Sequence, residues 1–443
     1  MSEYFRKYIK SSIRNELCPN KNGQIRFKTT FKNCVLDTLR KRNFKETEVE
    51  KDTEWDILWA DREWIYDILN HYHLQPHQKI NHFRNHYELT RKDLMVKNLK
   101  RYKKQLVKEG KTDDEYSLDF YPTTHNLPSD YSLFVEEFKK NPGSVWIMKP
   151  ISKAQGKGIF LFTKLAQISQ WKNDFRWKPD SPQADPYVVQ KYILRPFLIG
   201  GKKFDLRIYV LVTSYSPLTV YLYREGFARF THHRYSTNID DITNSFMHLT
   251  NVAVQKTSMA YDDKLGGKWD LRSLKIYLMT RYGQEEVSAA FTGVQDLILK
   301  SLQSVAKVII NDKHCFELYG FDVLFDAKLK PWLIEVNASP SLTATTPSDY
   351  NTKFNLLDDA FTVIDMENFL TGNEEQIGGF DLICKGTPSK LPINSTFKTY
   401  LGCYNNRKQQ LKKLAKITSS RLTQQYTQEI VNGGSSHKGG YRK

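Results

Sequence analysis

Cysteine is scarce in this chain and is scattered along it. Five cysteines occur among 443 residues, and no two of them form a Cys-x-x-Cys pair. This distribution disfavours a disulfide framework and a zinc site built on paired cysteines. It is typical of reduced thiols inside a cell.

Long apolar stretches are missing as well. No segment approaches the roughly 18 consecutive apolar residues that a membrane-spanning helix needs. The N-terminal stretch "MSEYFRKYIKSSIRNELCPN" carries charges throughout and lacks the apolar centre of a secretory signal. We therefore expect a soluble intracellular protein that has no membrane partner.

Acidic residues are outnumbered by basic ones. The 66 Lys and Arg against 49 Asp and Glu give a formal net charge of +17, which predicts an acidic partner. The chain contains no RRM, KH or zinc-finger signature and no aromatic–basic repeat, so we expect no nucleic-acid partner. It also lacks the HRD and DFG segments of a protein kinase.

The composition is that of a folded protein, with 40% apolar and 13% aromatic residues. Short strand-like and helical patterns alternate and predict an α/β fold. Thr90 and Asp93 have the spacing of a capping box for one of the helices. The pattern divides into an N-terminal α/β domain at 24–100, a central domain at 101–189, a C-terminal domain at 190–365, and a polar basic tail at 366–443 with a helix at about 405–417 and a disordered end.

The segment "KPWLIEVNASPSL", residues 330–342, places polar side chains at the end of an apolar strand. Glu335 and Asn337 share one face because side chains alternate along a strand. A turn near Asp326 would bring Asp322 opposite Glu335, so that these oxygen-bearing side chains converge. With no His or Cys beside them, such ligands suit Mg²⁺. A solvent-facing hairpin explains the same spacing about equally well.

A second motif is the glycine-containing loop "KPISKAQGKGIF", residues 149–160. Gly156 and Gly158 allow the backbone to approach a phosphate closely, and Lys149 stands at the end of the preceding strand. The loop is not followed by a Ser or Thr that opens a helix, so it is not a Walker A loop. A tight turn between two strands is the alternative.

A third motif, "GGKKFDLRIYVL", alternates polar and apolar residues. Lys203, Asp205 and Arg207 take one face of the predicted strand, which suits either a polar-lined cleft or a solvated surface. "YREG", which contains Arg224, and "HLTN" at 248–251 add a basic residue and a short polar turn. Each of these motifs is weak by itself.

Together, the motifs resemble the ATP-grasp ligase fold and, within it, the tubulin-tyrosine-ligase-like family. The resemblance rests on "WIMKP", "QGKGIF", "IGGKKFDLRIYVL", "REGFARF", "HLTNVAVQK", "CFELYGFDVLFD" and "KPWLIEVNASPSL". "NHFRNHYELTRKD" is similar to the polyglutamylase branch of the family, so the resemblance spans about residues 24–365. It implies an ATP-grasp fold with N-terminal, central and C-terminal α/β subdomains followed by the basic tail.

The resemblance also implies ATP and Mg²⁺ as cofactors and assigns residues to each. The family's magnesium ligands match Asp322, Glu335 and Asn337. Its nucleotide-binding positions match Lys149, Gln155, Gly156, Gln190, Lys191, Tyr192, Ile193, Lys203, Asp205, Thr250 and Asn251.

For the chemistry, the resemblance implies that ATP phosphorylates an acceptor carboxylate and that the amine of an amino acid attacks the acyl phosphate. Arg207 and Arg224 would be catalytic, and Arg224 would also hold the incoming amino acid. Gln155, Lys268 and Lys353 would bind substrate as well, although the spacing around the two lysines is looser.

The family relation points to the glutamate-rich C-terminal tails of tubulin as acceptor and to free L-glutamate as donor. It implies a cytoplasmic and cytoskeletal location, including the cilium, axoneme or basal body, and accessory subunits are a further expectation. "NNRKQQLKKLAKI", residues 405–417, predicts a helix with Leu411, Leu414 and Ile417 on one stripe and cations around it. That helix suits a microtubule-contacting element and a solvated surface helix about equally.

Two other functions share these motifs. A tubulin glycylase or tyrosine ligase would use the same ATP machinery, and the donor pocket would decide between them. A microtubule-binding scaffold that has lost catalysis is disfavoured by the presence of Lys149, Asp322, Glu335 and Asn337.

Overall fold

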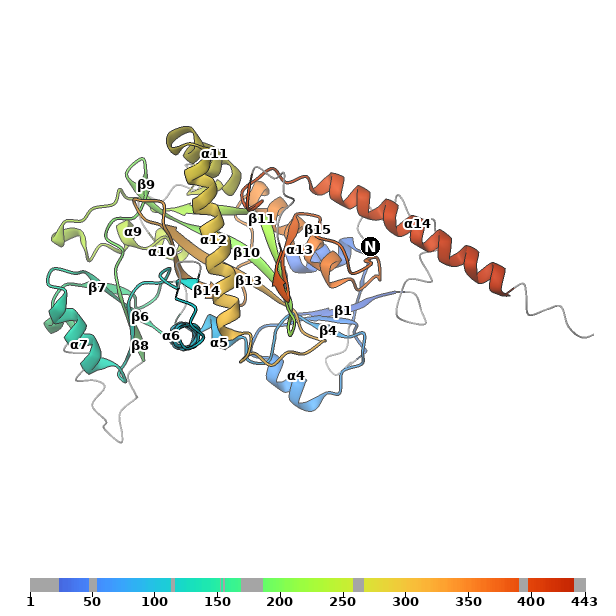
Figure 1. The fold of residues 1–443 in the computed structure, drawn as a ribbon, viewed down its shortest axis with the longest axis horizontal. Helices are drawn as coiled ribbons and strands as arrows, with labels where there is room; N and C mark the ends of the chain where they lie inside the picture. Colours follow the sequence, from blue (N-terminus) through green and yellow to red (C-terminus); the bar gives the residue numbers. More distant parts are fainter. Residues whose placement is uncertain are drawn as a thin grey trace, which may run out of the picture.

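The computed structural model describes residues 24–47, 54–112, 116–151, 153, 156–168, 186–257, 267–389 and 397–433. These residues form a mixed α/β protein with three sheets (Figure 1). The α/β class predicted from the sequence is confirmed, whereas the residue boundaries between subdomains stay predictions.

The N-terminal sheet has the strand order β2-β1-β3-β4, and its paired strands are parallel. The helices α3, Cys34–Lys41, and α4, Ile65–His71, connect its strands. Asn33 caps α3 because its Oδ1 accepts the Val35 backbone N–H at 2.9 Å. The strands are β1 Arg26–Thr29, β2 Lys45–Glu46, β3 Ile57–Trp59 and β4 Lys79–Ile80.

The predicted capping box at Thr90 is wrong. Thr90 is the last residue of the short helix α5, Tyr87–Thr90, and its hydroxyl donates to His86 O within that helix. The next helix, α6, Lys92–Lys108, begins after Arg91 and has no side-chain cap, while the Asp93 carboxylate accepts from the Arg91 guanidinium. A helix that already includes Thr90 leaves its hydroxyl to bond back along its own turn.

The central sheet is antiparallel, with the order β5-β8-β6-β7. β6 and β7 flank the glycine-containing loop, as the sequence predicts. The helix α7, Tyr131–Lys140, packs on this sheet through Phe134, against Trp146 and Phe162. The strands are β5 Thr124–Leu127, β6 Trp146–Pro150, β7 Phe160–Phe162 and β8 Tyr187–Lys191.

The large sheet has the main order β14-β13-β10-β11-β16-β15 and is antiparallel. The short strands β9, β12 and β17 pair with β10, β11 and β16. The bounds are β9 Leu198–Ile199, β10 Lys202–Tyr215, β11 Leu218–Phe230, β12 Lys268–Asp270, β13 Glu317–Phe325, β14 Pro331–Asn337, β15 Gln376–Ile377, β16 Phe380–Lys385 and β17 Thr387–Pro388.

Helices cover both faces of the large sheet. Leu206 and Ile208 of β10 pack in one core with α6 and the helices α11, Leu271–Tyr282, and α12, Gln284–Val305. Tyr209 and Leu211 pack in the other core with α3 and the helices α13, Pro347–Ile364, and α14, Arg407–Gly433. β10 is therefore buried on both faces, as its apolar run predicts. The short helices α9, Ser245–His248, and α10, Val252–Gln255, lie between β11 and β12 in the sequence.

The predicted hairpin is confirmed, while its role as a magnesium site stays a prediction. β13 and β14 pair with Asp322 opposite Glu335 and with Gly320 opposite Asn337. The connecting turn is closed by the Asp326 backbone N–H, which donates to Lys330 O at 3.0 Å. Asp322 and Glu335 therefore lie side by side on neighbouring strands.

The segment predicted as a polar tail contributes to the fold instead. β16 pairs with β11 of the large sheet, and Leu411 and Leu414 of α14 are buried in the core. The predicted helix is confirmed and is longer, but Ile417 is 42% exposed, so the predicted stripe is only partly buried. The outer part of α14 extends away from the rest of the molecule (Figure 1). The residues after 433 lie outside the described part of the chain.

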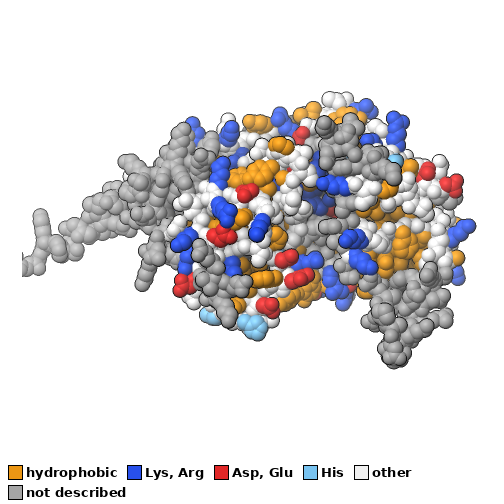
Figure 2. All heavy atoms as spheres, turned by 180° about the vertical axis from the view of Figure 1, so that it is seen from behind, with side chains coloured by type: hydrophobic (Ala, Val, Ile, Leu, Met, Phe, Trp, Pro, Cys, Tyr) orange, Lys and Arg blue, Asp and Glu red, His pale blue; other side chains and the backbone are white. Residues whose placement is uncertain are grey.

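The surface carries the excess positive charge in a dispersed form. Figure 2 shows Lys and Arg side chains spread across one face, with Asp and Glu side chains among them. None of the helices among the described residues combines the length and apolar character needed to cross a bilayer.

Candidate active site

Two adjoining cavities lie along the large sheet, and Thr250 lines both of them. The first cavity, which we call the nucleotide cavity, is formed where the central sheet meets β10, β13 and β14. It is lined by most of the predicted nucleotide and metal positions, namely Lys149, Gln190, Lys191, Tyr192, Ile193, Lys203, Asp205, Thr250, Asn251, Asp322 and Glu335.

Two buried ammonium groups face the nucleotide cavity without contacting a carboxylate of any described residue. Lys149 Nζ donates to Gln190 Oε1 at 2.7 Å. Lys203 Nζ donates to the Tyr192 hydroxyl at 2.9 Å and to His248 O at 2.8 Å. Burial lowers the pKa of Lys149 to about 8 and the pKa of Lys203 to about 7. Because buried cations are costly without an anion beside them, this pair fits the phosphates of a nucleotide.

Four buried charged side chains form a cluster at the base of the nucleotide cavity. We call it the cleft charge cluster, and its members are Asp205, Arg207, Arg229 and Asp322. Arg207 Nε and Nη2 donate to Asp322 at 2.6 and 3.1 Å. Arg229 donates to Asp205 at 2.8 and 2.5 Å, and its Nη2 also lies 2.7 Å from Asp322 Oδ2. Although burial alone would raise it, the two guanidiniums hold the pKa of Asp322 well below its ordinary value.

The oxygen donors of the hairpin fit a magnesium ion. Asp322 and Glu335 both line the nucleotide cavity, and the side chain of Glu335 is 24% exposed. Asn337 lies further along β14, where its Nδ2 donates to Gly320 O at 3.3 Å. This set offers carboxylate and amide oxygens with neither thiolate nor imidazole, which is the ligand chemistry that Mg²⁺ prefers.

The glycine-containing loop packs at Gly156 against Val254 and Asn251, and Asn251 lines the nucleotide cavity. Gly156 has a positive φ of 80°, and a Cβ placed there would lie 2.6 Å from Val254 Cγ2 and 3.4 Å from Asn251 Oδ1. Only glycine allows this close packing without a shift of the neighbours. Gln155, the other loop position predicted from the sequence, lies outside the described residues.

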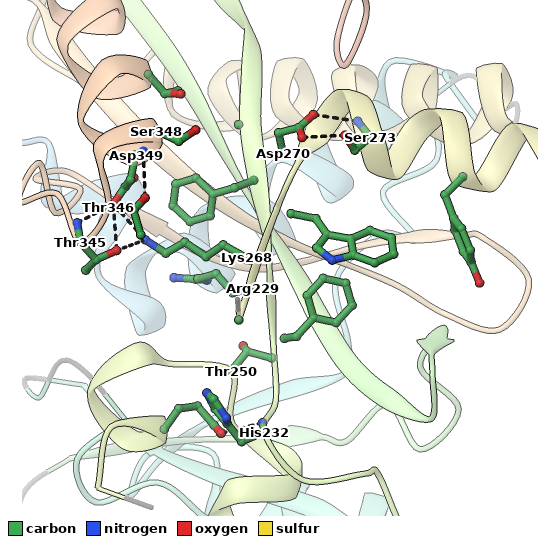
Figure 3. A pocket seen from close by; sticks show the side chains of 18 of the residues that line it. Arg229, His232, Thr250, Lys268, Asp270, Ser273, Thr345, Thr346, Ser348 and Asp349 are labelled. Carbon is green, nitrogen blue, oxygen red and sulfur yellow. Dashed lines mark hydrogen bonds and ion pairs between the residues drawn. The ribbon is translucent and has the colours of Figure 1, made fainter. Parts of the chain in front are cut away.

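The second cavity, which we call the substrate cavity, has a volume of about 840 Å³ and is lined by β11, β12, α11 and the start of α13. Figure 3 shows Arg229 and Lys268 in its wall, with Lys268 pointing toward Thr345 and Asp349. Lys268 Nζ lies 3.1 Å from Asp349 Oδ2. Lys353 Nζ binds the same oxygen at 3.1 Å but is buried behind the wall and donates to Thr343 O. Of the two predicted lysines, only Lys268 therefore faces the substrate cavity.

Arg224 does not lie in either cavity. Its Nε and Nη2 form a bidentate pair with Asp381 at 2.7 and 2.6 Å, and its Nη1 donates to Asn406 Oδ1. Its guanidinium also stacks over Tyr400 at 4.6 Å. Arg224 thus joins β11 to β16 and to the segment before α14, which is a structural role, and it does not reach the predicted amino-acid site.

Sequence reasoning missed Arg229, the second arginine of "REGFARF". Arg229 pairs directly with Asp205 across β10 and β11, so it lies where the predicted cleft residues lie. A signal existed, because the odd separation of Arg224 and Arg229 places them on opposite faces of a regular strand. Lys92 was also missed; its Nζ lies 3.8 Å from Glu335 at the start of α6.

Another group of metal-capable side chains is buried where the segment after β4 meets the start of β13, and its members are His82, His86 and Glu317. The Ala60 backbone N–H donates to Asn81 Oδ1, and Asn81 Nδ2 donates to Ala60 O, which fixes the orientation of the Asn81 amide. The atom that lies 3.1 Å from His82 Nε2 is therefore Nδ2, which donates to it. His82 Nδ1 must then carry the proton, which it donates to Glu317 Oε1 at 2.7 Å. Both ring nitrogens of His82 are therefore in use, and this group reads as a satisfied hydrogen-bond network.

Comparison with known proteins gives a consistent result. The model of the tubulin-tyrosine ligase family matches residues 68–375. A protein of Bos taurus named probable tubulin polyglutamylase TTLL9 is 48% identical over 430 residues, which cover 88% of this chain and 92% of the relative. A protein of Tetrahymena thermophila named probable alpha-tubulin polyglutamylase Ttll1 is 46% identical over 382 residues, which cover 81% of this chain and 92% of the relative.

Proposed function

This chain belongs to the tubulin-tyrosine ligase family, as its motifs predicted, and is an ATP-dependent ligase; from this premise we propose that it is a tubulin polyglutamylase. In the proposed reaction, ATP phosphorylates the side-chain carboxylate of a glutamate in a tubulin C-terminal tail and ADP is released. The amine of L-glutamate then attacks the acyl carbon, inorganic phosphate leaves, and the nitrogen loses a proton to give the amide. The names of its relatives, which are tubulin polyglutamylases, support this substrate.

The nucleotide cavity would hold ATP. Lys149 and Lys203 would bind its phosphates, and 190–193 would frame the adenine partly through backbone groups; all of them line this cavity. Asp322 and Glu335 would hold Mg²⁺, with Asn337 beside them on β14. When bound, ATP with Mg²⁺ supplies the phosphoryl group that converts the acceptor carboxylate into an acyl phosphate, because a carboxylate alone is a poor electrophile.

The substrate cavity would hold the acidic reactants. Arg229 takes the role predicted for Arg224, because its side chain lines this cavity while its guanidinium also binds Asp205 and Asp322. Arg guanidiniums bind carboxylates with two parallel hydrogen bonds, which fixes both charge and orientation. Lys268 adds a second cation in the wall. Arg207 and Arg229 together would neutralise the charge that develops on the attacked carboxyl group.

One observation carries the proposal. Residues separated by nearly two hundred positions in the sequence, from Lys149 to Glu335, line one cavity with buried cations and hard oxygen donors. That cavity shares a wall with a larger one that presents an arginine and a lysine. A nucleotide site next to a carboxylate site is the arrangement that an ATP-dependent ligation needs.

The charge of the protein supports an acidic tail as partner. A chain with net charge +17 steers an acidic, disordered segment toward itself, and the association rate falls with added salt. Exposed Lys408, Lys412, Lys413 and Lys416 on α14 would add contacts to the microtubule surface. From the same premise we propose a location in the cytoplasm on the cytoskeleton, with the cilium, axoneme or basal body as finer locations. Accessory subunits are also part of the proposal.

The test uses purified protein with stabilised microtubules, ATP and Mg²⁺. L-glutamate, glycine and L-tyrosine are supplied separately, and the intact mass of tubulin is measured. We expect additions of the mass of glutamate that disappear when Glu335→Gln replaces the wild type. Additions of the mass of glycine or tyrosine would support an amino-acid ligase but contradict L-glutamate as the donor. Microtubule pelleting without any addition, in the presence of tight ATP binding, would contradict catalysis by the isolated chain and would leave a scaffold or an enzyme that requires an accessory subunit.

A further inference from the structure

The two cavities are separated by a thin wall of ionic contacts. Asp205 and Asp322 line the nucleotide cavity, whereas Arg229 lines the substrate cavity. Arg229 Nη2 lies 2.7 Å from Asp322 Oδ2 and 2.5 Å from Asp205 Oδ2. One guanidinium therefore contacts the acids of one cavity and faces the space of the other.

The carboxylate of Asp322 is occupied on both oxygens. Arg207 Nε donates to Oδ1 at 2.6 Å, while Arg207 Nη2 and Arg229 Nη2 both contact Oδ2. These contacts use three of the roughly four lone-pair sites of the carboxylate, and a divalent cation bound there would repel both positive groups at short range. Metal binding at Asp322 and the Arg229–Asp322 contact therefore compete.

While Arg229 binds both Asp205 and Asp322, it cannot direct its full set of N–H donors at a substrate carboxylate. Its Nε and Nη2 are the atoms that bond to Asp205, and Nη2 bonds to Asp322 as well. Bidentate carboxylate binding needs two N–H groups of the fork directed at the ligand. Releasing the Asp322 contact restores donor capacity, while the Asp205 pair keeps the guanidinium in the wall.

From these contacts we infer that Arg229 couples the two sites, so that a nucleotide with its Mg²⁺ in the nucleotide cavity raises the affinity of the substrate cavity for a carboxylate. This inference rests on the proposed function, because it takes the first ligand to be Mg²⁺–nucleotide and the second to be an acidic amino acid. Linkage requires the effect to be reciprocal, so the carboxylate ligand tightens nucleotide binding by the same factor.

Lys268 provides a matched control in the same cavity. Its ammonium is also held by a carboxylate, that of Asp349, at 3.1 Å. Asp349 lines only the substrate cavity and not the nucleotide cavity. Lys268 therefore lacks the shared contact that Arg229 has, and it should contribute to carboxylate binding without contributing to coupling.

The first test is calorimetric titration of L-glutamate into the full chain with and without Mg²⁺ and the non-hydrolysable ATP analogue AMP-PNP. We expect about tenfold tighter binding with the nucleotide, within the usual range of coupling between sites. Arg229→Lys should reduce that ratio to less than about twofold while still binding AMP-PNP, which also shows that it is folded. Lys268→Gln should weaken binding in both states and keep the ratio. Equal wild-type affinities, or a full ratio in Arg229→Lys, would overturn the inference.

The second test measures the metal directly, with Mn²⁺ as a paramagnetic substitute followed by electron paramagnetic resonance. Without nucleotide, Arg229→Gln should bind Mn²⁺ about tenfold more tightly than the wild type, because one guanidinium has left Asp322. Equal Mn²⁺ affinities would overturn the competition. If L-glutamate binds in neither state but glycine does, the proposed donor fails, and the same ratio measured with glycine decides the coupling.

Discussion

The protein contains two buried charge clusters that have different roles. The cleft charge cluster separates the two cavities. The other, which we call the helical charge cluster, ties α3 and α13 to the start of α14, and its members are Arg42, Asp358, Asp359, Glu367 and Arg407. In both clusters arginines bind buried carboxylates at short distances, and all of these arginines except the partly buried Arg407 are buried themselves.

The two clusters differ in whether their side chains line a cavity. Every member of the cleft charge cluster except Arg207 lines one of the two cavities, whereas no member of the helical charge cluster lines either. In the helical cluster Arg42 binds Asp358 and Glu367, and Arg407 binds Asp358 and Asp359, so each charge already has its partner. Buried ion pairs therefore do not identify an active site by themselves. An ion pair that a ligand can reach and replace does.

The largest expected effect is on stability, from Arg42→Ala in the helical charge cluster. Removing Arg42 takes the buried guanidinium away from Glu367 and leaves Asp358 with Arg407 as its remaining arginine, and breaking such a buried network costs about 3–5 kcal/mol of unfolding free energy. Urea unfolding followed by tryptophan fluorescence measures it. Arg40→Ala is the matched control on the same helix. Its pair with Glu46 is exposed, at 61% and 39%, so its loss should cost about 0–1 kcal/mol. Equal losses in the two variants would contradict this account of the cluster.

The next effect is on catalysis, from Glu335→Gln beside the cleft charge cluster. Among the described residues Glu335 has one ion-pair partner, Lys92 at 3.8 Å, and its side chain is 24% exposed, so its replacement does not break a buried short-range pair. Loss of one metal ligand should lower kcat/KM by at least about 100-fold, which is about 2.7 kcal/mol, with little change in the unfolding midpoint. Glu54→Gln, whose side chain is 74% exposed in a surface pair, is the control for loss of one negative charge. Retained activity in Glu335→Gln would remove Glu335 from the metal site.

The sequence predicted the parts of the site that depend on short-range geometry. Asp322 opposite Glu335 follows from a hairpin with a short turn, and Lys203 with Asp205 follows from strand alternation. Arg229 was missed because choosing between two arginines needs the register of β11 against β10, and that pairing contains a shift between Ile208 and Val210. The shift sets four residue steps of β11 against two of β10, so the alternation of faces continues across it, and the local pattern does not show which face of β11 meets the cavities.

The C-terminal region was harder to predict for a different reason. β15 and β17 are two residues long, so they carry no readable alternation. β16 joins the sheet through β11, about 160 positions earlier in the chain, and that pairing is a tertiary contact. Polar composition after residue 366 therefore suggested a tail, although Arg407 and Leu411 anchor α14 to the core.

A paired substitution sharpens the comparison within one strand. Arg224→Lys and Arg229→Lys both keep the charge and lose the fork that binds a carboxylate bidentately. For Arg229→Lys we expect about a tenfold lower kcat/KM, mainly through the KM for glutamate, because Arg229 lines the substrate cavity. For Arg224→Lys we expect a lower unfolding midpoint and an unchanged KM, because its partners are Asp381 and Asn406. The reverse pattern would restore Arg224 as the substrate residue.

The smallest expected effect concerns pH and the nucleotide cavity. Burial lowers the pKa of Lys203 to about 7, so in the free protein a growing share of this side chain is neutral as the pH rises above 7. Bound phosphates stabilise the ammonium and raise that pKa, so binding takes up a proton and affinity falls with rising pH. For a single group of pKa about 7, the Kd for AMP-PNP should rise about fivefold between pH 7 and pH 8.

Lys203→Arg isolates this contribution, because a guanidinium stays charged across the range and the titration of the nucleotide itself is common to both proteins. Lys149, whose pKa burial lowers to about 8, adds a weaker dependence of about twofold over the same range, and this dependence remains in the variant. Calorimetry between pH 7 and pH 8 therefore separates the two lysines. An equal rise in Kd for both proteins would mean that Lys203 does not bind phosphate as an ammonium. A flat wild-type profile would mean that its ammonium keeps its proton without the nucleotide.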